Sequence, residues 1–303
     1  ELKRGFARFS GPRVVEVEGE CFTAPHIVIA TGGRPALPAL PGAELGIDSD
    51  GFFALEAQPR RVAVVGAGYI AVELAGVFRG LGSEVSMLVR GDRLLRPFDA
   101  MLREELAVQM QEDGITLRFG AQAHALRRQA DGSLLVDCGE AGKLEVDALV
   151  WATGRQPNTD RLQLAAAGIE ADAKGTIPTD AFQNTNVPGI YAIGDVTMKL
   201  MLAHTAEAQG VVAAETIAGA ETMPINYDMV PRATYCQPQI GSFGFTEAQA
   251  AERGYEVKVA KFPFSANGKA HGLGDATGFV KIVADARYNE LLGAHMVGPD
   301  VSE

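Results

Sequence analysis

The sequence predicts an α/β protein with a Rossmann-like parallel βαβ unit and a smaller α+β domain toward its end. One observation is an apolar strand at 62–65, a glycine-rich turn, a helical pattern and a second apolar strand at 85–89, in uninterrupted succession. The other is the run of short alternating segments after residue 227, which surround a single helical stretch as in an antiparallel sheet. The chain is long enough for two domains or more.

The turn after the first strand has the small residues that the pyrophosphate of a dinucleotide needs. Gly66 permits the tight turn, Gly68 lets the backbone approach the phosphates, and Ala71 lets the helix pack close to the strand. Tyr69 and Ile70 complete the turn, and the helix that follows directs the positive end of its dipole to the same place. These residues are therefore expected to bind a dinucleotide.

The end of the second strand indicates which dinucleotide is bound. An NAD site usually has Asp or Glu there, to accept a hydrogen bond from the ribose 2′-hydroxyl. This chain instead has Arg90, followed by Arg93 and Arg96. Because a guanidinium fork suits a 2′-phosphate, Arg90 and Arg96 predict NADPH rather than NADH, with Arg93 as a neighbour. The alternative is an ordinary solvated cationic loop.

The composition argues against several classes of function. The formal net charge is −11, which disfavours nucleic acid and an anionic membrane surface as partners. No apolar run reaches the ~18–20 residues of a membrane span, so no membrane is expected. Cys21, Cys138 and Cys236 lie far apart without a CxxC pair, which predicts neither a disulfide framework nor a metal site and favours a reducing cytoplasm.

The elements on either side of the βαβ unit follow from alternation and from turn residues. Before it, we expect a hairpin of strands 13–18 and 21–30, an extended Pro-rich connection at 34–42 and a turn-rich segment at 48–55. After it, we expect a helix from 98 to about 111, a strand at 115–119 and a three-stranded antiparallel meander within 121–150.

The last third of the chain is expected to change from buried elements to an antiparallel domain. A short buried strand at 190–193 precedes an Ala-rich helix at 204–218, which Gly219 ends. The final domain is expected to hold one helix at 246–253, which Thr246 and Gln249 open with a capping box. Its strands are expected at 232–236, 240–245, 255–262, 279–284 and 291–297.

Five segments in order along the chain resemble the flavoprotein disulfide reductases. They are IATGG (29–33), VVGAGYIAVELAG (64–76), WATGRQPNT (151–159), TNVPGIYAIGDV (185–196) and LAHTAEAQGVVAAETIAG (202–219). Residues 1–195 look most like glutathione reductase, and residues 198–303 look more like dihydrolipoamide dehydrogenase. A natural mosaic, a divergent member and a joined sequence are all consistent with this change of resemblance.

The resemblance implies a Rossmann-like flavoprotein fold with two dinucleotide-binding domains, its N-terminal part missing, and an incomplete α+β dimerisation domain. The implied parts are residues 1–30 as the tail of the FAD-binding domain, 31–157 as the NADPH-binding domain, 158–226 as the return to the FAD-binding domain, and 227–303 as the dimerisation domain. The family's FAD GxGxxG loop, CxxxxC pair and His-Pro…Glu pair do not occur in this sequence. We therefore expect a middle fragment, inactive by itself and poorly soluble.

The resemblance also implies roles for residues near the nicotinamide. Tyr69 would lie over the flavin and swing aside when nicotinamide enters. Glu73 would pair with a lysine near the reactive cysteines, a lysine that this sequence does not have; alternatively, it complements the helix dipole. Gly154 and Arg155 would close the nucleotide domain and face the nicotinamide.

The FAD site is implied by a second group of residues. Asp195 would accept a hydrogen bond from the ribityl chain. Met201, Leu202 and Ala203 would place backbone amides at the pyrimidine edge of the isoalloxazine, where a helix N-terminus favours negative charge. Thr31 and Gly32 would make further FAD contacts.

Taken together, the resemblance implies an FAD-dependent, NADPH-preferring reductase of a small-molecule disulfide, active as a homodimer. Glutathione disulfide is the expected substrate, and dihydrolipoamide is the alternative. Two other classes stay open: a nucleotide-binding module without turnover, and a flavin-dependent oxidase or metal-ion reductase on the same scaffold.

Overall fold

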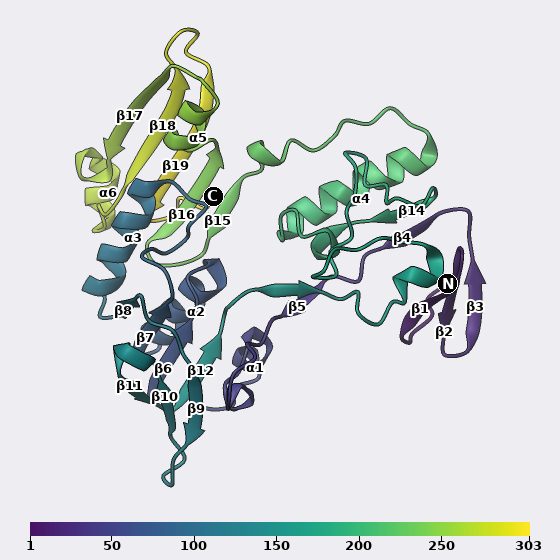
Figure 1. Ribbon diagram of the computed structural model, residues 1–303. Helices are drawn as coiled ribbons and strands as arrows, with labels where there is room; N and C mark the ends of the chain where they lie inside the picture. Colours follow the sequence, from purple (N-terminus) through teal and green to yellow (C-terminus); the bar gives the residue numbers. More distant parts are fainter. The chain divides into compact units, whose positions relative to one another are not determined.

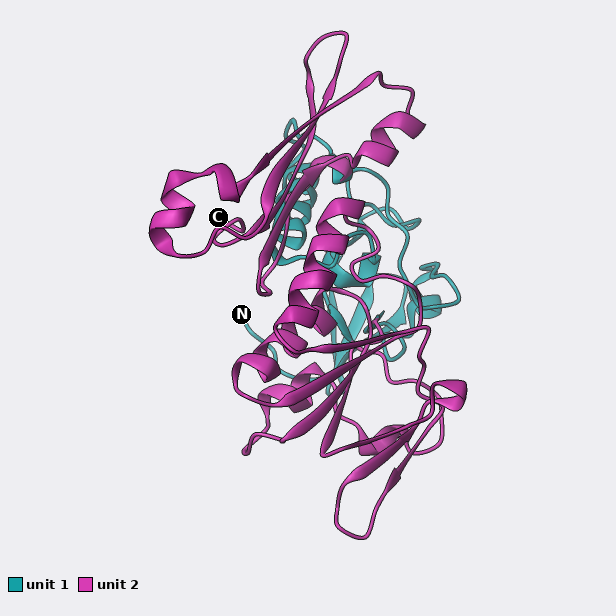
Figure 2. Ribbon diagram, turned by 90° about the vertical axis from the view of Figure 1, so that its left-hand side faces the viewer, with its two compact units in different colours: residues 1–34, 155–227 teal, residues 35–154, 228–303 magenta.

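The computed structural model describes residues 1–303 and divides into two compact units, coloured separately in Figure 2. Unit 1 combines residues 1–34 with residues 155–227, and unit 2 combines residues 35–154 with residues 228–303. Each unit is therefore assembled from two separate stretches of the chain.

A four-stranded parallel sheet forms the centre of the first part of unit 2, with strand order β12-β6-β7-β8 (Figure 1). Its strands are β6 (Arg61–Val65), β7 (Glu84–Val89), β8 (Thr116–Phe119) and β12 (Ala148–Trp151). The helices of this part are α1 (Ser49–Phe53), α2 (Tyr69–Gly80) and α3 (Ala100–Glu112). The strands are parallel because a helix or a longer connection returns the chain to the same edge each time.

Both faces of this sheet are buried, which explains why β6 is apolar along its length. Val62 and Val64 belong to the core cluster that includes the buried sides of α2 and α3, whereas Ala63 and Val65 belong to a cluster on the other face. That second cluster includes the inner side chains of an antiparallel meander, β9 (Ala125–Arg128), β10 (Leu134–Asp137) and β11 (Lys143–Val146). A continuous apolar run is the pattern expected of a strand covered on both sides.

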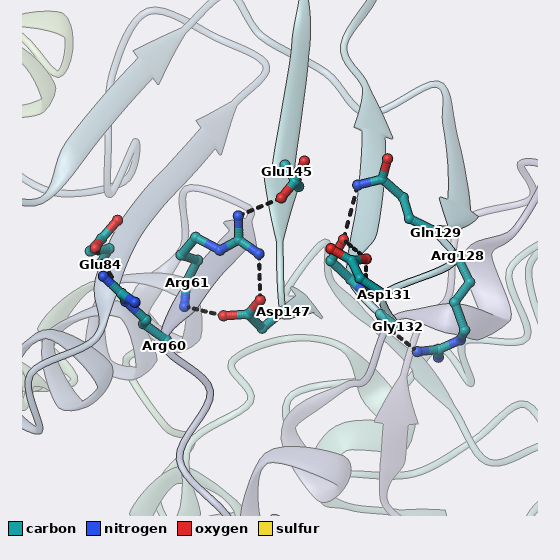
Figure 3. A network of polar contacts seen from close by, with 10 residues as sticks. Arg60, Arg61, Glu84, Arg128, Gln129, Asp131, Gly132, Glu145 and Asp147 are labelled. Atoms are coloured by element: carbon teal, nitrogen blue, oxygen red, sulfur yellow. Dashed lines mark hydrogen bonds and ion pairs between the residues drawn. The ribbon is translucent and has the colours of Figure 1, made fainter.

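An arginine fork fastens the meander to the parallel sheet at the start of β6 (Figure 3). The guanidinium of Arg61 donates to Glu145 at 2.6 Å and to Asp147 at 2.6 Å, and its backbone N–H donates to Asp147 at 2.8 Å. The hydrogen bonds from Arg61 hold the pKa of both carboxyl groups below their usual values. At the start of β6, charge-assisted hydrogen bonds therefore add to the apolar contact between the meander and the sheet.

The second part of unit 2 is a five-stranded antiparallel sheet with strand order β15-β16-β19-β18-β17. Its strands are β15 (Arg232–Thr234), β16 (Gln239–Gly244), β17 (Val257–Pro263), β18 (Phe279–Asp285) and β19 (Leu291–Gly298), and its helices are α5 (Glu247–Glu252) and α6 (Gly268–Leu273). Helix α3, from the first part of unit 2, contacts β19, and Figure 1 shows α3 beside this antiparallel sheet.

Unit 1 is built from small sheets around one apolar cluster. Its strands are β1 (Ala7–Gly11), β2 (Val14–Val17), β3 (Glu20–Thr23), β4 (Ile27–Ile29), β13 (Arg155–Pro157) and β14 (Ile190–Ala192), and β5 (Gly33–Pro35) pairs with β13. Strand β4 pairs in parallel with β14, and the helix α4 (Ala203–Ala218) follows. None of the helices in the structure combines the length and the apolarity needed to cross a bilayer.

Most of the predicted elements are confirmed, and three expectations are wrong in detail. The expected strand at 21–30 is two strands, β3 and β4, because Pro25 cannot donate to a ladder and interrupts it. The turn-rich segment at 48–55 contains helix α1, which Asp48 caps by accepting from Gly51 N–H. The final domain holds a second helix, α6, whose cap is Asn267.

Candidate functional site

The glycine turn between β6 and α2 has the backbone geometry that its sequence predicts. Gly66 has φ +147°, and a Cβ there would lie 2.3 Å from the carbonyl oxygen of Ala152. The same Cβ would lie 3.1 Å from the methyl group of Ala71, which is itself fully buried. The structure therefore requires glycine at 66 and a very small residue at 71.

Gly68, in contrast, is not required by the packing of the protein. A Cβ on Gly68 would meet nothing within 4 Å, so the protein itself leaves that face of the turn open. Gly68 is also the N-cap of α2, and it has no side chain to occupy the free N–H groups of the first helical turn. These N–H groups and the dipole form a site for an anion such as a pyrophosphate.

Tyr69 and Ile70 lie at the start of α2, half-buried against the core cluster of the parallel sheet. Tyr69 is thus the first helical residue and not a loop residue. A tyrosine at this place combines an apolar body that packs against the protein with a polar end.

Three arginines follow β7 in distinct environments. Arg93 pairs with the adjacent Asp92, and that hydrogen bond lowers the pKa of Asp92 to about 2. Arg90 and Arg96 are exposed and form no ion pair or hydrogen bond. Arg90 and Arg96 are therefore the two guanidinium groups of this segment that an incoming phosphate could engage without breaking an existing pair.

Two leucines fix the segment that carries these arginines, here called the arginine segment (residues 90–98). Leu94 and Leu95 are both only 1% exposed, and Leu95 N–H donates to the carbonyl of Ala67 in the glycine turn at 2.7 Å. Gly91 accepts from Gly120 N–H at 3.0 Å on the other side. Sequence reasoning missed Leu95, although two adjacent leucines within a cationic run were a signal that the run is not simply solvated.

Glu73 lies one turn further along α2, beside the segment before β16. Its carboxylate accepts from the backbone N–H of Tyr235 at 2.9 Å, and burial raises its pKa above the usual value. Burial and the nearby Glu73 raise the pKa of the Cys236 thiol to about 12. Glu73 is not in the first helical turn, so its contact with Tyr235 explains its position better than the helix dipole does.

Gly154 closes the nucleotide-type part of unit 2. It has φ +135°, which favours glycine, and its carbonyl accepts from Ala36 N–H at 2.9 Å. The next residue, Arg155, belongs to unit 1. The guanidinium of Arg155 lies 3.5 Å from the carboxylate of Asp195 and donates to Gly33 O at 2.6 Å, so its charge is directed to Asp195.

Asp195 lies in a short 3-10 turn (Gly194–Thr197) that follows β14 in unit 1. Gly33 is close enough that a Cβ there would lie 3.2 Å from Asp195 Cβ, so glycine makes room for this carboxylate. Asp195 is partly exposed, with 24% of its side chain accessible. It can therefore accept a hydrogen bond from a hydroxyl-bearing ligand while it remains paired with Arg155.

Gln209 supports this turn from α4, and sequence reasoning missed it. It is fully buried, accepts from Gly194 N–H at 2.6 Å and donates to the hydroxyl of Tyr227 at 3.0 Å. The signal in the sequence was a large polar residue on the inner face of an Ala-rich helix. A buried polar side chain in such a place is expected to form hydrogen bonds.

The remaining predicted flavin residues lie in unit 1. The N-cap of α4 is Leu202, without a side-chain hydrogen bond; Met201 and Leu202 are half-buried and Ala203 is exposed. Thr31 donates to Asn158 O at 3.0 Å, and Asn158 N–H donates to Gly32 O at 2.9 Å. The first-turn N–H groups of α4 could therefore donate to an electron-rich ligand edge, as those of α2 could donate to a phosphate.

Comparison with known proteins agrees with this arrangement. A family model described as "Pyridine nucleotide-disulphide oxidoreductase" matches residues 1–210, and the model of its dimerisation domain matches residues 230–303. A glutathione reductase from Burkholderia cepacia is 41% identical over 303 residues, which cover 100% of this chain and 67% of the relative. A dihydrolipoyl dehydrogenase from Mycobacterium leprae is 42% identical, with 99% and 67% covered.

Solved structures give the same result at lower identity. The HOCl-induced flavoprotein disulfide reductase RclA from Escherichia coli matches with a TM-score of 0.91 and 28% identity, over 98% of this chain and 69% of that chain. LpdA from Mycobacterium tuberculosis matches with a TM-score of 0.91 and 26% identity, over 99% and 68%. This chain spans about two thirds of the length of these proteins. The chain belongs to the pyridine nucleotide-disulphide oxidoreductase family.

Proposed function

We propose that this chain binds NADPH in unit 2 and FAD in unit 1, as the nucleotide-binding part of a glutathione-disulfide-reductase-like enzyme. The observation that carries the proposal is the pair Arg90 and Arg96, exposed and unpaired on a segment that Leu95 fastens to the glycine turn. This contact fixes the backbone that carries the two arginines beside the glycine turn. That arrangement suits an adenosine ribose with a 2′-phosphate.

In the proposed NADPH site, each group of residues has one task. The first-turn N–H groups of α2 hold the pyrophosphate, which Gly68 allows to approach the backbone. Arg90 and Arg96 neutralise the 2′-phosphate. Tyr69 would cover the nicotinamide position until the nucleotide enters, and Gly154, whose Cβ position is open, would leave room for that ring.

In the proposed FAD site, Asp195 accepts from the ribityl hydroxyls, and the ion pair with Arg155 orients its carboxylate. Gln209 fixes the turn that carries Asp195. Residues 201–203 present backbone N–H groups to the flavin edge, with Thr31 and Gly32 as further contacts. When bound, NADPH supplies a hydride, and FAD accepts it and passes the electrons on toward a disulfide.

The three cysteines define what this chain contributes by itself. Cys21 is exposed, Cys138 and Cys236 are buried, all three are free, and none forms a CxxxxC pair. We therefore propose that residues 1–303 bind nucleotides without turnover of a disulfide by themselves. Glu73 is then a supporting residue rather than a catalytic one.

A titration of the protein with NADP⁺ and NAD⁺ tests the nucleotide assignment. We expect NADP⁺ to bind at least about 10-fold more tightly, since a charge-assisted hydrogen bond contributes roughly 1.5–3 kcal/mol. Arg90→Glu should weaken NADP⁺ binding by about 10- to 100-fold, and it should reduce the difference between the affinities for NADP⁺ and NAD⁺. Isothermal titration calorimetry at one fixed salt concentration measures both ligands.

Arg93→Gln is the matched control, because Arg93 lies in the same segment but already pairs with Asp92. For this variant, the ratio of the NADP⁺ affinity to the NAD⁺ affinity should stay within about twofold of the wild-type ratio. Equal affinity of the wild-type protein for NADP⁺ and NAD⁺ would refute the assignment.

Dihydrolipoyl dehydrogenase is the second candidate function. It is favoured by the relatives of that name, which are 40–43% identical and aligned over 94–100% of this chain. In that case, the arginine segment would be an exposed cationic loop, and the titration would give no preference for the 2′-phosphate. The same experiment therefore separates the two candidates.

The dimerisation-domain match supports a homodimer, in which residues 230–303 supply the interface. Analytical ultracentrifugation measures this directly. The three free cysteines support a reducing compartment, and we propose the cytoplasm.

A further inference from the structure

A buried ion cluster in unit 2 lies where the antiparallel sheet meets the start of α3. Lys281, on β18, is only 2% exposed, and its Nζ lies 3.0 and 3.1 Å from the two carboxylate oxygens of Asp99. Asp99 is 3% exposed. Glu247, at the start of α5, accepts from the same Nζ at 2.8 Å but is 55% exposed. The cluster thus has a buried pair and one peripheral carboxylate.

The Lys281 side chain is charged at neutral pH. Burial alone would lower its pKa, but the hydrogen bonds to Glu247 and Asp99 outweigh burial and raise the pKa above the usual value. His295 faces Lys281 across the β18–β19 ladder, and burial lowers its pKa. Both ring nitrogens of His295 are taken up by Phe245 O and Ser242 Oγ, so the ring does not compete with Lys281 for Asp99.

Asp99 also has a second role. It is the N-cap of α3, where its carboxylate accepts from Met101 N–H at 3.1 Å. It is the residue that directly follows the arginine segment, whose last residue, Phe98, donates its N–H to Leu95 O at 2.8 Å. Lys281 therefore holds the residue at which the arginine segment ends and helix α3 begins.

We infer that the Lys281–Asp99 pair is a positioning device for the arginine segment, and through it for recognition of the 2′-phosphate. The inference rests on the proposed NADPH site. Leu95 fixes the middle of the segment to the glycine turn, and Asp99 fixes its end to the antiparallel sheet. With both points held, the backbone at Arg96, three residues before Asp99, keeps one conformation, and a phosphate does not have to order that backbone first.

A purely stabilising role explains the pair less well. A buried ion pair contributes little net stability compared with apolar side chains of similar size, and its best-attested use is to specify one arrangement among several. Lys281 lies on the sheet that matches the dimerisation domain, and its partner Asp99 directly follows the arginine segment. The device thus connects the dimerisation sheet with cofactor preference.

Asp99→Asn is the variant of choice to test this inference. It keeps a side-chain oxygen for the N-cap of α3, and it leaves Lys281 paired with Glu247. Lys281→Met is less informative, because it leaves the buried Asp99 carboxylate without its cation, which destabilises the fold as a whole. Glu247→Gln is the matched control: it removes the other carboxylate of the cluster without touching the arginine segment.

The first readout is amide hydrogen exchange in the ligand-free protein, followed at Leu95 N–H. Asp99→Asn should raise that exchange rate at least about fivefold, whereas Glu247→Gln should leave it within about twofold of wild type. This readout does not depend on which nucleotide binds. An unchanged rate in Asp99→Asn overturns the inference even if the wild-type protein prefers NADP⁺.

The second readout is the affinity for adenosine 2′,5′-bisphosphate compared with AMP. In Asp99→Asn, the first affinity should fall by about 3- to 10-fold and the second by less than about twofold, with both unchanged in Glu247→Gln. An equal loss for both ligands means that the pair serves general stability, and this also overturns the inference. Absence of a preference in the wild-type protein instead refutes the proposed NADPH site.

Discussion

At the scale of single residues, the two glycines of the glycine turn differ in how the protein constrains them, although a sequence motif treats them alike. Gly66 is fixed by the protein, because a Cβ would collide with the carbonyl of Ala152 and φ is positive. Gly68 is not fixed by the protein, because its Cβ position is open. The first glycine therefore serves folding, and the proposed role of the second is to let a ligand approach the backbone.

This difference predicts opposite outcomes for two alanine variants. Gly66→Ala should lower the free energy of unfolding by roughly 1–3 kcal/mol or more, because backbone strain and a close contact occur together. Gly68→Ala should leave the free energy of unfolding within about 0.5 kcal/mol and still weaken dinucleotide binding about 10-fold or more. Urea unfolding and calorimetric titration measure the two effects; similar stability losses in both variants would contradict the separation.

Cys236 is predicted to be an inert thiol. Burial and the adjacent Glu73 raise its pKa to about 12, so its thiolate fraction at pH 8 is roughly one in ten thousand. We expect iodoacetamide to modify exposed Cys21 well before Cys236 in the native protein, and all three cysteines at similar rates in urea. Peptide mass spectrometry over a time course measures this. Modification of native Cys236 as fast as Cys21 would show that the thiol is neither buried nor raised in pKa.

The sequence was sufficient for residues whose role is local. Gly66, Gly68 and Ala71 act within six residues of one another, so a motif could identify them. Leu95, Gln209 and Lys281 could not be identified in this way, because each acts on a partner that only folding brings close. The structure also revealed that Arg155 pairs with Asp195, a contact between residues 40 positions apart in sequence.

At the scale of elements, short contacts decide where a strand or helix begins. The capping box of Thr246 and Gln249 is confirmed, because both of its hydrogen bonds are within four residues. The expected strand at 21–30 was wrong, because Ile27–Ile29 pairs with Ile190–Ala192 and not with its neighbours in sequence. The alternation of apolar and polar residues predicted which positions are apolar, but pairing with a distant part of the chain decided where the strand begins and ends.

The arginine fork between β6 and the meander predicts how stability depends on pH. Hydrogen bonds from Arg61 lower the folded-state pKa values of Asp147 and Glu145. Carboxyl groups with lowered pKa values add stability that is fully present above their unfolded-state values, near pH 4, and that is lost as pH falls through the folded-state values.

We therefore expect Arg61→Met to be less stable than wild type at pH 7, with a difference that shrinks as the pH falls below about 4. Urea unfolding at a series of pH values measures both proteins. Arg60→Met is the control, since Arg60 forms only a long, exposed ion pair with Glu84 at 3.8 Å. A difference between Arg61→Met and wild type that is constant with pH would contradict the assignment of the lowered pKa values.

At the scale of the whole molecule, the two candidate cofactor sites fall into different units. The residues proposed for NADPH, Gly66 to Gly154, lie in unit 2, and those proposed for FAD, Thr31 and Asp195 with residues 201–203, lie in unit 1. Along the sequence, Thr31 of the proposed FAD group comes first, the NADPH group follows, and the rest of the FAD group comes last. A resemblance to a family could supply this assignment, whereas periodicity could not, because nothing in the local pattern says which distant stretches share a core.

This division predicts a selective response to nucleotide. A ligand stabilises the unit to which it binds by RT ln(1 + [L]/Kd), about 2.7 kcal/mol at 100 times Kd. With NADP⁺ in excess, hydrogen exchange should slow in residues 62–98 of unit 2 and change little in residues 155–227 of unit 1. Mass spectrometry of peptic peptides measures both; equal slowing in the two units would contradict a site confined to unit 2.

The pairing of β4 with β14 has a consequence during synthesis on the ribosome. Ile27 leaves the exit tunnel about 160 residues before its partner Ile190, a delay of roughly 8–30 s at ordinary rates of translation. The parallel sheet of unit 2 ends at Trp151, so it can assemble within that interval. During this interval, the apolar strand Ile27–Ile29 is on the nascent chain without its partner strand, so we expect it to be a segment that chaperones bind.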